Sequence, residues 1–164
     1  MKIALIIAGA LVGLVMLVAV IGALLPRDHT ASASARFRAT PDQLFALVSG
    51  PQTWRSTVKQ YEELPSEGGR KRWRETDSHG ETVEYEVVES AAPRRLKTRI
   101  ASEGLPYGGT WTYELTAHGD ETEVRITEDG QVYNPIFRFV GRFIIGYESS
   151  MRGYLKDLER ASRE

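Results

Sequence analysis

The C-terminal part of the chain has a helical period, and it constrains the fold more than any other stretch. Across residues 134–160, charged side chains such as Arg138 and Arg142 fall on one side of a helical wheel. The dipeptide Asn134-Pro135 favours a helix start, because Asn caps free amides and Pro fits the first helical position. A single amphipathic helix cannot bury its apolar face alone, so another part of the chain must cover it. The apolar face consists of Ile136, Phe139, Val140, Phe143, Ile144, Tyr147, Met151, Tyr154 and Leu158.

Residues 57–133 are predicted to supply the covering surface as six β-strands. Short clusters of Gly, Pro, Asp and Ser separate runs in which apolar and polar residues alternate. The alternation places Tyr85, Leu96, Trp111, Tyr113 and Ile126 on inward faces. Consecutive strands joined by tight turns pair antiparallel, and such a sheet has one wet face and one covered face. The final helix is therefore expected to lie on the apolar face of this sheet.

A further strand and two short helices are predicted before the six strands. Residues 31–38 alternate in the manner of a strand. Thr40, Pro41 and Gln43 then match a capping box with Pro at the first helical position. Residues 51–54 allow one more helical turn. No repeat or long linker interrupts this order, so residues 27–164 are expected to form one domain.

Residues 3–25 contain no charged or strongly polar side chain and are long enough to cross a hydrocarbon core of roughly 30 Å. This indicates a single-pass membrane anchor over residues 1–26. A cleaved signal peptide is the alternative, although the apolar run exceeds the usual length of about 7 to 15 residues. The charges on the two sides, Lys2 against Arg27, Arg36 and Arg38, leave open the side on which the domain lies.

Ile145 is an isolated apolar residue on the charged side of the predicted final helix. It is either an ordinary exposed residue or the sign of a helix that rests on a lipid surface. In the second interpretation Arg138 and Arg142 would lie at the headgroups.

The composition excludes some classes of function. Lys and Arg total 21 against 22 for Asp and Glu, so the chain lacks the basic excess that is typical of nucleic-acid binding. There are no cysteines, which rules out disulfides and thiolate metal sites. None of the three histidines has metal-ligand spacing, and no cofactor-binding motif is present. We therefore expect no metal and no cofactor, and the sequence names no protein partner.

Two inward carboxylates are weak candidates for catalysis. Alternation places Glu75 in line with Trp73, and Glu128 in line with Val124 and Ile126. A carboxyl group in an apolar cavity can serve as a general acid or base. The alternative is that both lie at strand ends, open to water or paired with an Arg. Several aromatic side chains are predicted to line a pocket or to fill a core, and the candidate ligand-binding set is Trp54, Trp73, Tyr85, Tyr107, Trp111, Tyr113, Phe139, Phe143 and Tyr147.

The order of elements resembles the START-like, Bet v 1-like (SRPBCC) superfamily, in particular its polyketide cyclase/dehydrase-like branch. The similar segments are residues 39–45 (ATPDQLF), 51–54 (PQTW), 89–96 (ESAAPRRL), 109–115 (GTWTYEL) and 119–124 (GDETEV). The chain departs from many relatives at Arg55, Ser56 and Thr57, where these have a second Trp soon after the first. The resemblance implies an α+β helix-grip fold, in which a curved antiparallel sheet of about seven strands surrounds a long C-terminal helix.

The resemblance also implies a hydrophobic tunnel between the sheet and the final helix. The leading hypothesis is a membrane-anchored binding or carrier domain for a hydrophobic, lipid-like small molecule. Two alternatives remain open. One is a cyclase/dehydratase-type enzyme with Glu75 or Glu128 as acid/base, and the other is a membrane-tethered protein-interaction module.

Overall fold

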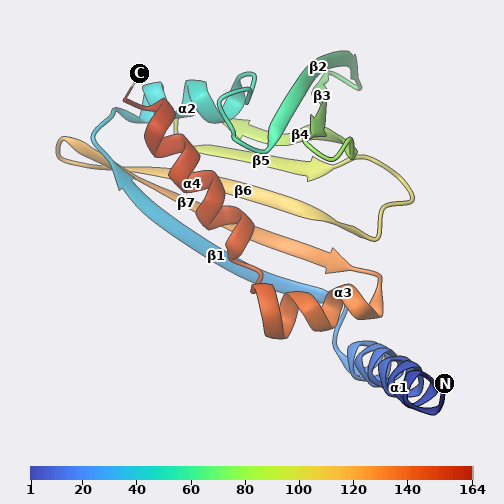
Figure 1. Cartoon of the computed structure of the whole chain (residues 1–164). Helices are drawn as coiled ribbons and strands as arrows, with labels where there is room; N and C mark the ends of the chain where they lie inside the picture. The colour runs from blue at the N-terminus through green and yellow to red at the C-terminus, as the bar shows by residue number, and fades with distance from the viewer. Residues whose placement is uncertain (164) are drawn as a thin grey trace.

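A computed structural model describes residues 1–163 and contains a seven-stranded antiparallel sheet with helices on one side (Figure 1). The helices are α1 (Lys2–Leu24), α2 (Pro41–Ser49), α3 (Pro135–Val140), the π-helical turn η1 (Gly141–Ile145) and α4 (Ser149–Ala161). The strands are β1 (Asp28–Phe37), β2 (Val58–Glu67), β3 (Arg70–Asp77), β4 (Thr82–Ala91), β5 (Arg95–Ile100), β6 (Tyr107–His118) and β7 (Glu121–Val132).

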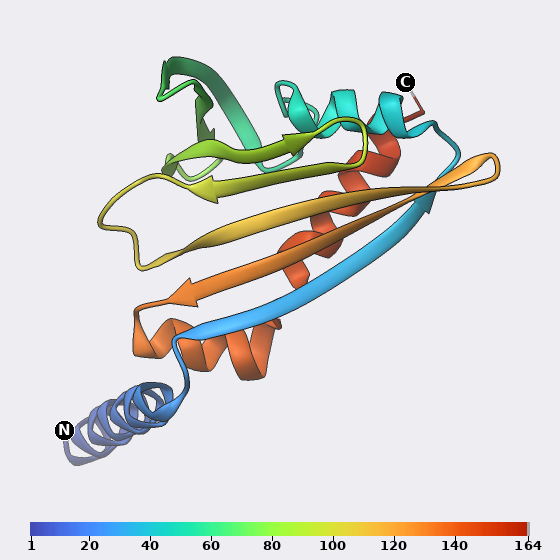
Figure 2. The same ribbon diagram turned by 180° about the vertical axis from the view of Figure 1, so that it is seen from behind.

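The strand order is β1-β7-β6-β5-β4-β3-β2, so only β1 pairs with a strand distant in sequence. The sheet is curved, and α4 runs across its concave face, as the views from the two sides show (Figures 1 and 2). This confirms the predicted α+β helix-grip fold and the six consecutive antiparallel strands. Residues 51–54, expected to add a second short helix, form a turn instead.

The inward side chains predicted by alternation form the core. Leu96, Tyr113 and Ile126 from the sheet pack with Met151 and Leu158 from α4, and all five are at most 4% exposed. The predicted capping box at the start of α2 is also present. The Thr40 hydroxyl accepts from the Gln43 amide, and the Gln43 side chain accepts from the Thr40 amide. The local sequence pattern was enough to predict the inward side chains, because one face of each strand or helix meets solvent and the other does not.

The prediction of one continuous helix from residue 134 to 160 is wrong. The helix begins as expected at the Asn134 cap but passes into η1 and ends at Gly146, whose φ of 80° lies outside the helical region. The chain turns there, and α4 starts afresh at Ser149. A π-helical turn and a glycine with positive φ are both established ways of ending or bending a helix. The segment formed by α3 and η1 therefore points its apolar face in a different direction from α4. Of these two segments, α4 is the one that covers the sheet.

Two consequences of this break contradict the helical wheel. Phe143 and Ile144, assigned to the buried face, are 59% and 70% exposed. Arg138, assigned to the charged face, is only 6% exposed. Its guanidinium donates to the Leu25 carbonyl at 2.7 Å, just past the end of α1.

The helix α1 is long and apolar enough to cross a membrane, and none of its most apolar 18-residue window, with a mean hydropathy of 3.0, is buried by the rest of the chain. A signal sequence has the same properties. The helix leads directly into β1 and lies next to α3 at one end of the domain (Figure 1).

Candidate functional site

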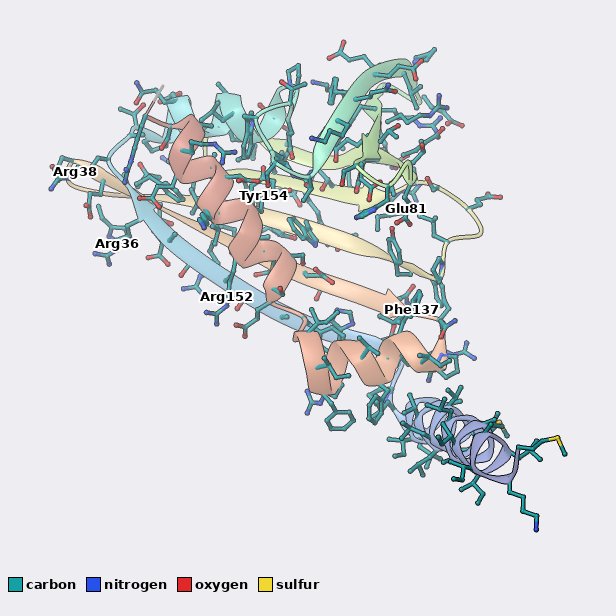
Figure 3. All side chains as sticks on the ribbon, viewed as in Figure 1. Arg36, Arg38, Glu81, Phe137, Arg152 and Tyr154 are labelled. Atoms are coloured by element: carbon teal, nitrogen blue, oxygen red, sulfur yellow. The ribbon has the colours of Figure 1, made fainter. Side chains whose placement is uncertain are left out.

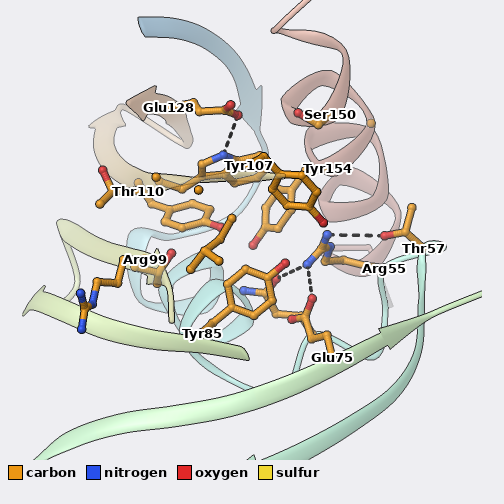
Figure 4. Close-up of a pocket in the computed structure, with 18 of the residues that line it drawn as sticks. Arg55, Thr57, Glu75, Tyr85, Arg99, Tyr107, Thr110, Glu128, Ser150 and Tyr154 are labelled. Carbon is orange, nitrogen blue, oxygen red and sulfur yellow. Dashed lines mark hydrogen bonds and ion pairs between the residues drawn. The ribbon is translucent and has the colours of Figure 1, made fainter. Parts of the chain in front are cut away.

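A cavity of about 460 Å³ lies between the concave face of the sheet and α4. This volume is in the range of pockets that take up small organic ligands, roughly 300–1,000 Å³. Strands β3 to β7 contribute one wall, α4 contributes another, and the turn between α2 and β2 closes one side. Figure 4 shows the lining side chains converging on this space.

Seven of the side chains proposed from the sequence line the cavity. They are Glu75, Glu128, Trp73, Tyr85, Tyr107, Trp111 and Tyr113. All seven come from strands, and alternation, which is a reliable guide to the inward face, predicted six of them; Tyr107 is the exception.

The other four proposed residues do not line it. The Trp54 ring packs edge-on against Tyr154 within the core, with 5.2 Å between ring centroids. Phe139 packs against the exposed Phe143, and Tyr147 stacks on His29. The last three lie before α4, so the helix break directs them away from the cavity.

A buried ion pair occupies one wall of the cavity. Arg55 Nη1 donates to Glu75 Oε2 at 2.8 Å, and Trp73 Nε1 donates to the other carboxylate oxygen at 2.9 Å. The Glu75 side chain is 7% exposed and that of Arg55 is 20% exposed. Arg55 also donates to the Gln52 side-chain oxygen at 3.3 Å and lies over the Tyr154 ring. The two opposite charges thus satisfy each other inside a largely aromatic space (Figure 4).

The electrostatics of this wall favour neutral tyrosines beside a charged arginine. Burial is the largest single influence on the pKa of Arg55 and lowers it, but the Glu75 carboxylate and the surrounding tyrosines together outweigh burial, so the pKa is raised. Burial raises the pKa of Tyr113 to about 12, and it also raises those of Tyr85 and Tyr154. The Tyr154 hydroxyl has no hydrogen-bond partner among residues 1–163. Its oxygen is buried, and the Tyr154 ring packs against that of Tyr113 with 5.5 Å between centroids.

A second polar cluster lies toward the start of β1. His29 Nε2 is 2.9 Å from Glu128 Oε1, and Trp111 Nε1 donates to Glu128 Oε2 at 2.7 Å. The His29 ring stacks on Tyr147 with 3.7 Å between centroids. Glu75 and Glu128 are thus each held by two side-chain partners. Among residues 1–163, no cluster of three or more acidic or histidine side chains is placed to hold a metal ion.

Sequence reasoning missed Arg55, Tyr154 and His29 as cavity residues. Arg55 occupies the segment in which the chain departs from many relatives, and that departure was the available signal. His29 shares the inward parity of Ala31 and Ala33, but the predicted strand began two residues after it. Tyr154 was placed correctly on the apolar face of the final helix, yet the helical wheel does not distinguish a cavity wall from a filled core.

A family model described as "Polyketide cyclase / dehydrase and lipid transport" matches residues 28–163. The chain belongs to this family. The match covers the whole sheet, α2, α3 and α4, and leaves out α1. No curated protein matches the chain in sequence.

Solved structures of other proteins share the fold of this chain. A protein of Thermus thermophilus is 23% identical, with a TM-score of 0.64 over 82% of this chain and 97% of that one. A START superfamily protein of Mycobacterium smegmatis is 16% identical, with a TM-score of 0.64 over 82% and 97%. Norcoclaurine synthase of Thalictrum flavum is 12% identical, with a TM-score of 0.62 over 84% and 87%. At these identities the likeness establishes the fold, which in this family is associated with ligand binding or cyclase-type activity.

Proposed function

We propose that the protein is a membrane-anchored binding domain for a hydrophobic small molecule that carries a neutral oxygen at one end. The observation that carries this proposal is the cavity of about 460 Å³ with aromatic walls and the paired charges of Arg55 and Glu75. Its aromatic walls favour an apolar body of the ligand. The helix α1 would hold the domain at the membrane in which such molecules are found.

The preference for a neutral oxygen follows from the charge of the polar wall. The Arg55 guanidinium is already neutralised by Glu75, so a ligand carboxylate would meet a buried carboxylate of the same charge. A carbonyl or hydroxyl group carries no charge and therefore no such penalty. Ketones, alcohols, esters and quinones with long apolar tails fit this description better than free fatty acids.

Native mass spectrometry of the full chain, released from mild detergent, tests the binding function. We expect a hydrophobic adduct that is identified after denaturation, or one that forms with a panel of quinones, fatty alcohols and phospholipids. Gly153→Phe should abolish the adduct, because Gly153 lines the cavity and a side chain added there meets open space. Gly153→Ala is the matched control and should retain the adduct. Failure of every ligand to bind the folded wild-type chain would contradict the proposal.

The same assay tests the chemical preference with a fatty alcohol and a fatty acid of equal chain length. The alcohol should bind more tightly at pH 8, where the acid is ionised. Glu75→Gln leaves Arg55 without its partner, so this variant should reverse the order and favour the acid. An unchanged order in Glu75→Gln would show that the ion pair does not select the ligand.

A further inference from the structure

The most exposed apolar surface of the folded domain lies on α3 and η1. Phe137, Phe143, Ile144 and Ile145 are 49%, 59%, 70% and 63% exposed, and Ile136 is 38% exposed. We call these five residues the apolar patch. Among residues 25–163, outside the patch, only Val88 and Tyr133 are large apolar side chains with comparable exposure. Exposed apolar side chains gathered on one short segment mark a surface that binds something, because isolated exposed apolar residues are the usual case.

The patch is joined to the end of α1 by a close contact between backbones. A Cβ atom at Gly22 would collide with the Pro135 carbonyl, so the two helices touch at the first residue of α3. Arg138 donates to the carbonyl oxygens of Leu25 at 2.7 Å and Ala23 at 3.5 Å. A cation that binds the last carbonyls of a helix stabilises that end of the helix. The direction of α3 is thus tied to that of α1.

This junction identifies what covers the patch. The apolar surface of α1 is unburied and ends at Leu24, where α3 crosses it, so the patch continues the surface that faces lipid. In Figure 3, Phe137 projects from α3 at the end of the domain that α1 approaches. Arg142 on η1 is exposed, and it forms no ion pair within residues 1–163. Apolar residues next to a free cation are typical of helices that lie in the membrane interface.

We propose that α3 and η1 lie in the headgroup–acyl boundary of the same bilayer that α1 spans. Phe143, Ile144 and Ile145 insert among the acyl chains, and Arg142 binds lipid phosphates. This inference rests on the proposed membrane anchor. It adds that the domain has one fixed orientation, held by two contacts with the bilayer rather than by a flexible tether.

The proposed orientation brings the cavity close to the lipid. Directly after η1, Tyr147 stacks on His29, and His29 and Ser149 line the cavity. The segment that contacts the bilayer is therefore continuous with one end of the cavity. A hydrophobic ligand could pass between the bilayer and this end without crossing much water.

Labelling of single cysteines in the full chain tests the proposal, because the wild-type chain has no cysteine. The variants are Ile144→Cys in the patch, Val12→Cys in the middle of α1 and Ser66→Cys in β2. Strand β2 forms the sheet edge opposite β1, and Ser66 is exposed. Each variant is labelled with an environment-sensitive fluorophore and placed in nanodiscs of phosphatidylcholine and phosphatidylglycerol. Quenching is measured with iodide in water and with lipids that carry a nitroxide on the acyl chain.

We expect the label at position 144 to resist iodide several-fold better than the label at 66, and to be quenched by the nitroxide lipids. Iodide quenching equal to that at position 66 would overturn the proposal. Protection from iodide without lipid quenching would also overturn it, because a protein surface or a second copy would then cover the patch. If the label at position 12 escapes the lipid quencher too, the anchor itself fails. The measurement thus separates failure of the patch from failure of the anchor.

Discussion

The buried pair of Arg55 and Glu75 should couple the stability of the fold to the chemistry of the cavity. Glu75→Gln keeps the size of the side chain and removes its charge, which leaves the Arg55 guanidinium without a counter-ion. Removing one partner of a buried ion pair typically costs about 3–5 kcal/mol. The Arg55 side chain is 20% exposed and keeps contacts with Gln52 and the Tyr154 ring, which moderate the loss. We therefore expect a decrease of about 2–3 kcal/mol in the free energy of unfolding, just below that range.

A double-mutant cycle isolates the pair from the separate effects of each substitution. Arg55→Met with Glu75→Gln removes both charges and retains an apolar side chain of similar length. The double variant should lose less stability than the sum of the two single variants, with a coupling energy of about 2 kcal/mol. Urea unfolding of the full chain in detergent micelles, followed by tryptophan fluorescence, measures all four proteins. Trp73 reports directly on the site, since its indole donates to Glu75.

An exposed ion pair of similar length provides the matched control. Arg74 and Glu62 lie 3.0 Å apart, but their side chains are 38% and 61% exposed. Glu62→Gln should change the free energy of unfolding by no more than about 1 kcal/mol, because water screens the pair. If Glu75→Gln has an equally small effect, or if the coupling energy is below about 0.5 kcal/mol, the pair is not buried as described.

Two further predictions concern the tyrosines and the helix break. The raised pKa values of Tyr113 and Tyr154 mean that the folded state keeps protons that the unfolded chain releases above about pH 10. The free energy of unfolding should stay constant below that pH and then fall by about 1.4 kcal/mol per pH unit for each tyrosine. Unfolding measured from pH 8 to 11 should show a shallower decline for the double variant Tyr113→Phe/Tyr154→Phe than for the wild-type chain. An identical decline would refute the raised pKa values of these two tyrosines. Gly146→Ala, at a φ of 80°, should destabilise the fold by about 1–3 kcal/mol, seen as a lower Tm. Gly153 lies inside α4 and has no close contacts, so Gly153→Ala should raise the free energy of unfolding by up to about 1 kcal/mol. If Gly146→Ala and Gly153→Ala change the free energy of unfolding equally, the helix does not break at Gly146.

Much of the candidate site could be anticipated because it is built on strands. Six of its residues occupy inward positions because side chains on a strand alternate between the two faces of the sheet, and this alternation is kept along a short strand. They are Trp73, Glu75, Tyr85, Trp111, Tyr113 and Glu128. The predictions for the last helix were less successful. A helical wheel assumes an unbroken helix, and the break between Gly146 and Ser149 changes the direction of every residue that precedes α4. Phe139, Phe143 and Tyr147 therefore left the predicted cavity together.

The polar partners of the cavity were beyond the reach of sequence patterns. Arg55 and Glu75 are 20 residues apart, and His29 and Glu128 are 99 residues apart. Neither pair belongs to one element, so no local period links its members. Arg138 was predicted to be exposed because it is charged. It is buried because it donates to the backbone carbonyls of Ala23 and Leu25, and backbone acceptors cannot be recognised from the sequence.

The sequence by itself determined the order of the elements, the inward face of each strand, the cap of α2 and the apolar character of α1. These properties depend on neighbours within a few residues, so alternation, capping residues and turns are enough to specify them. The tertiary structure alone decided where the final helix breaks, which charges meet across the cavity and how α3 is joined to α1. Those outcomes depend on contacts between distant segments, and such contacts exist only after the sheet has curved and α4 has packed against it.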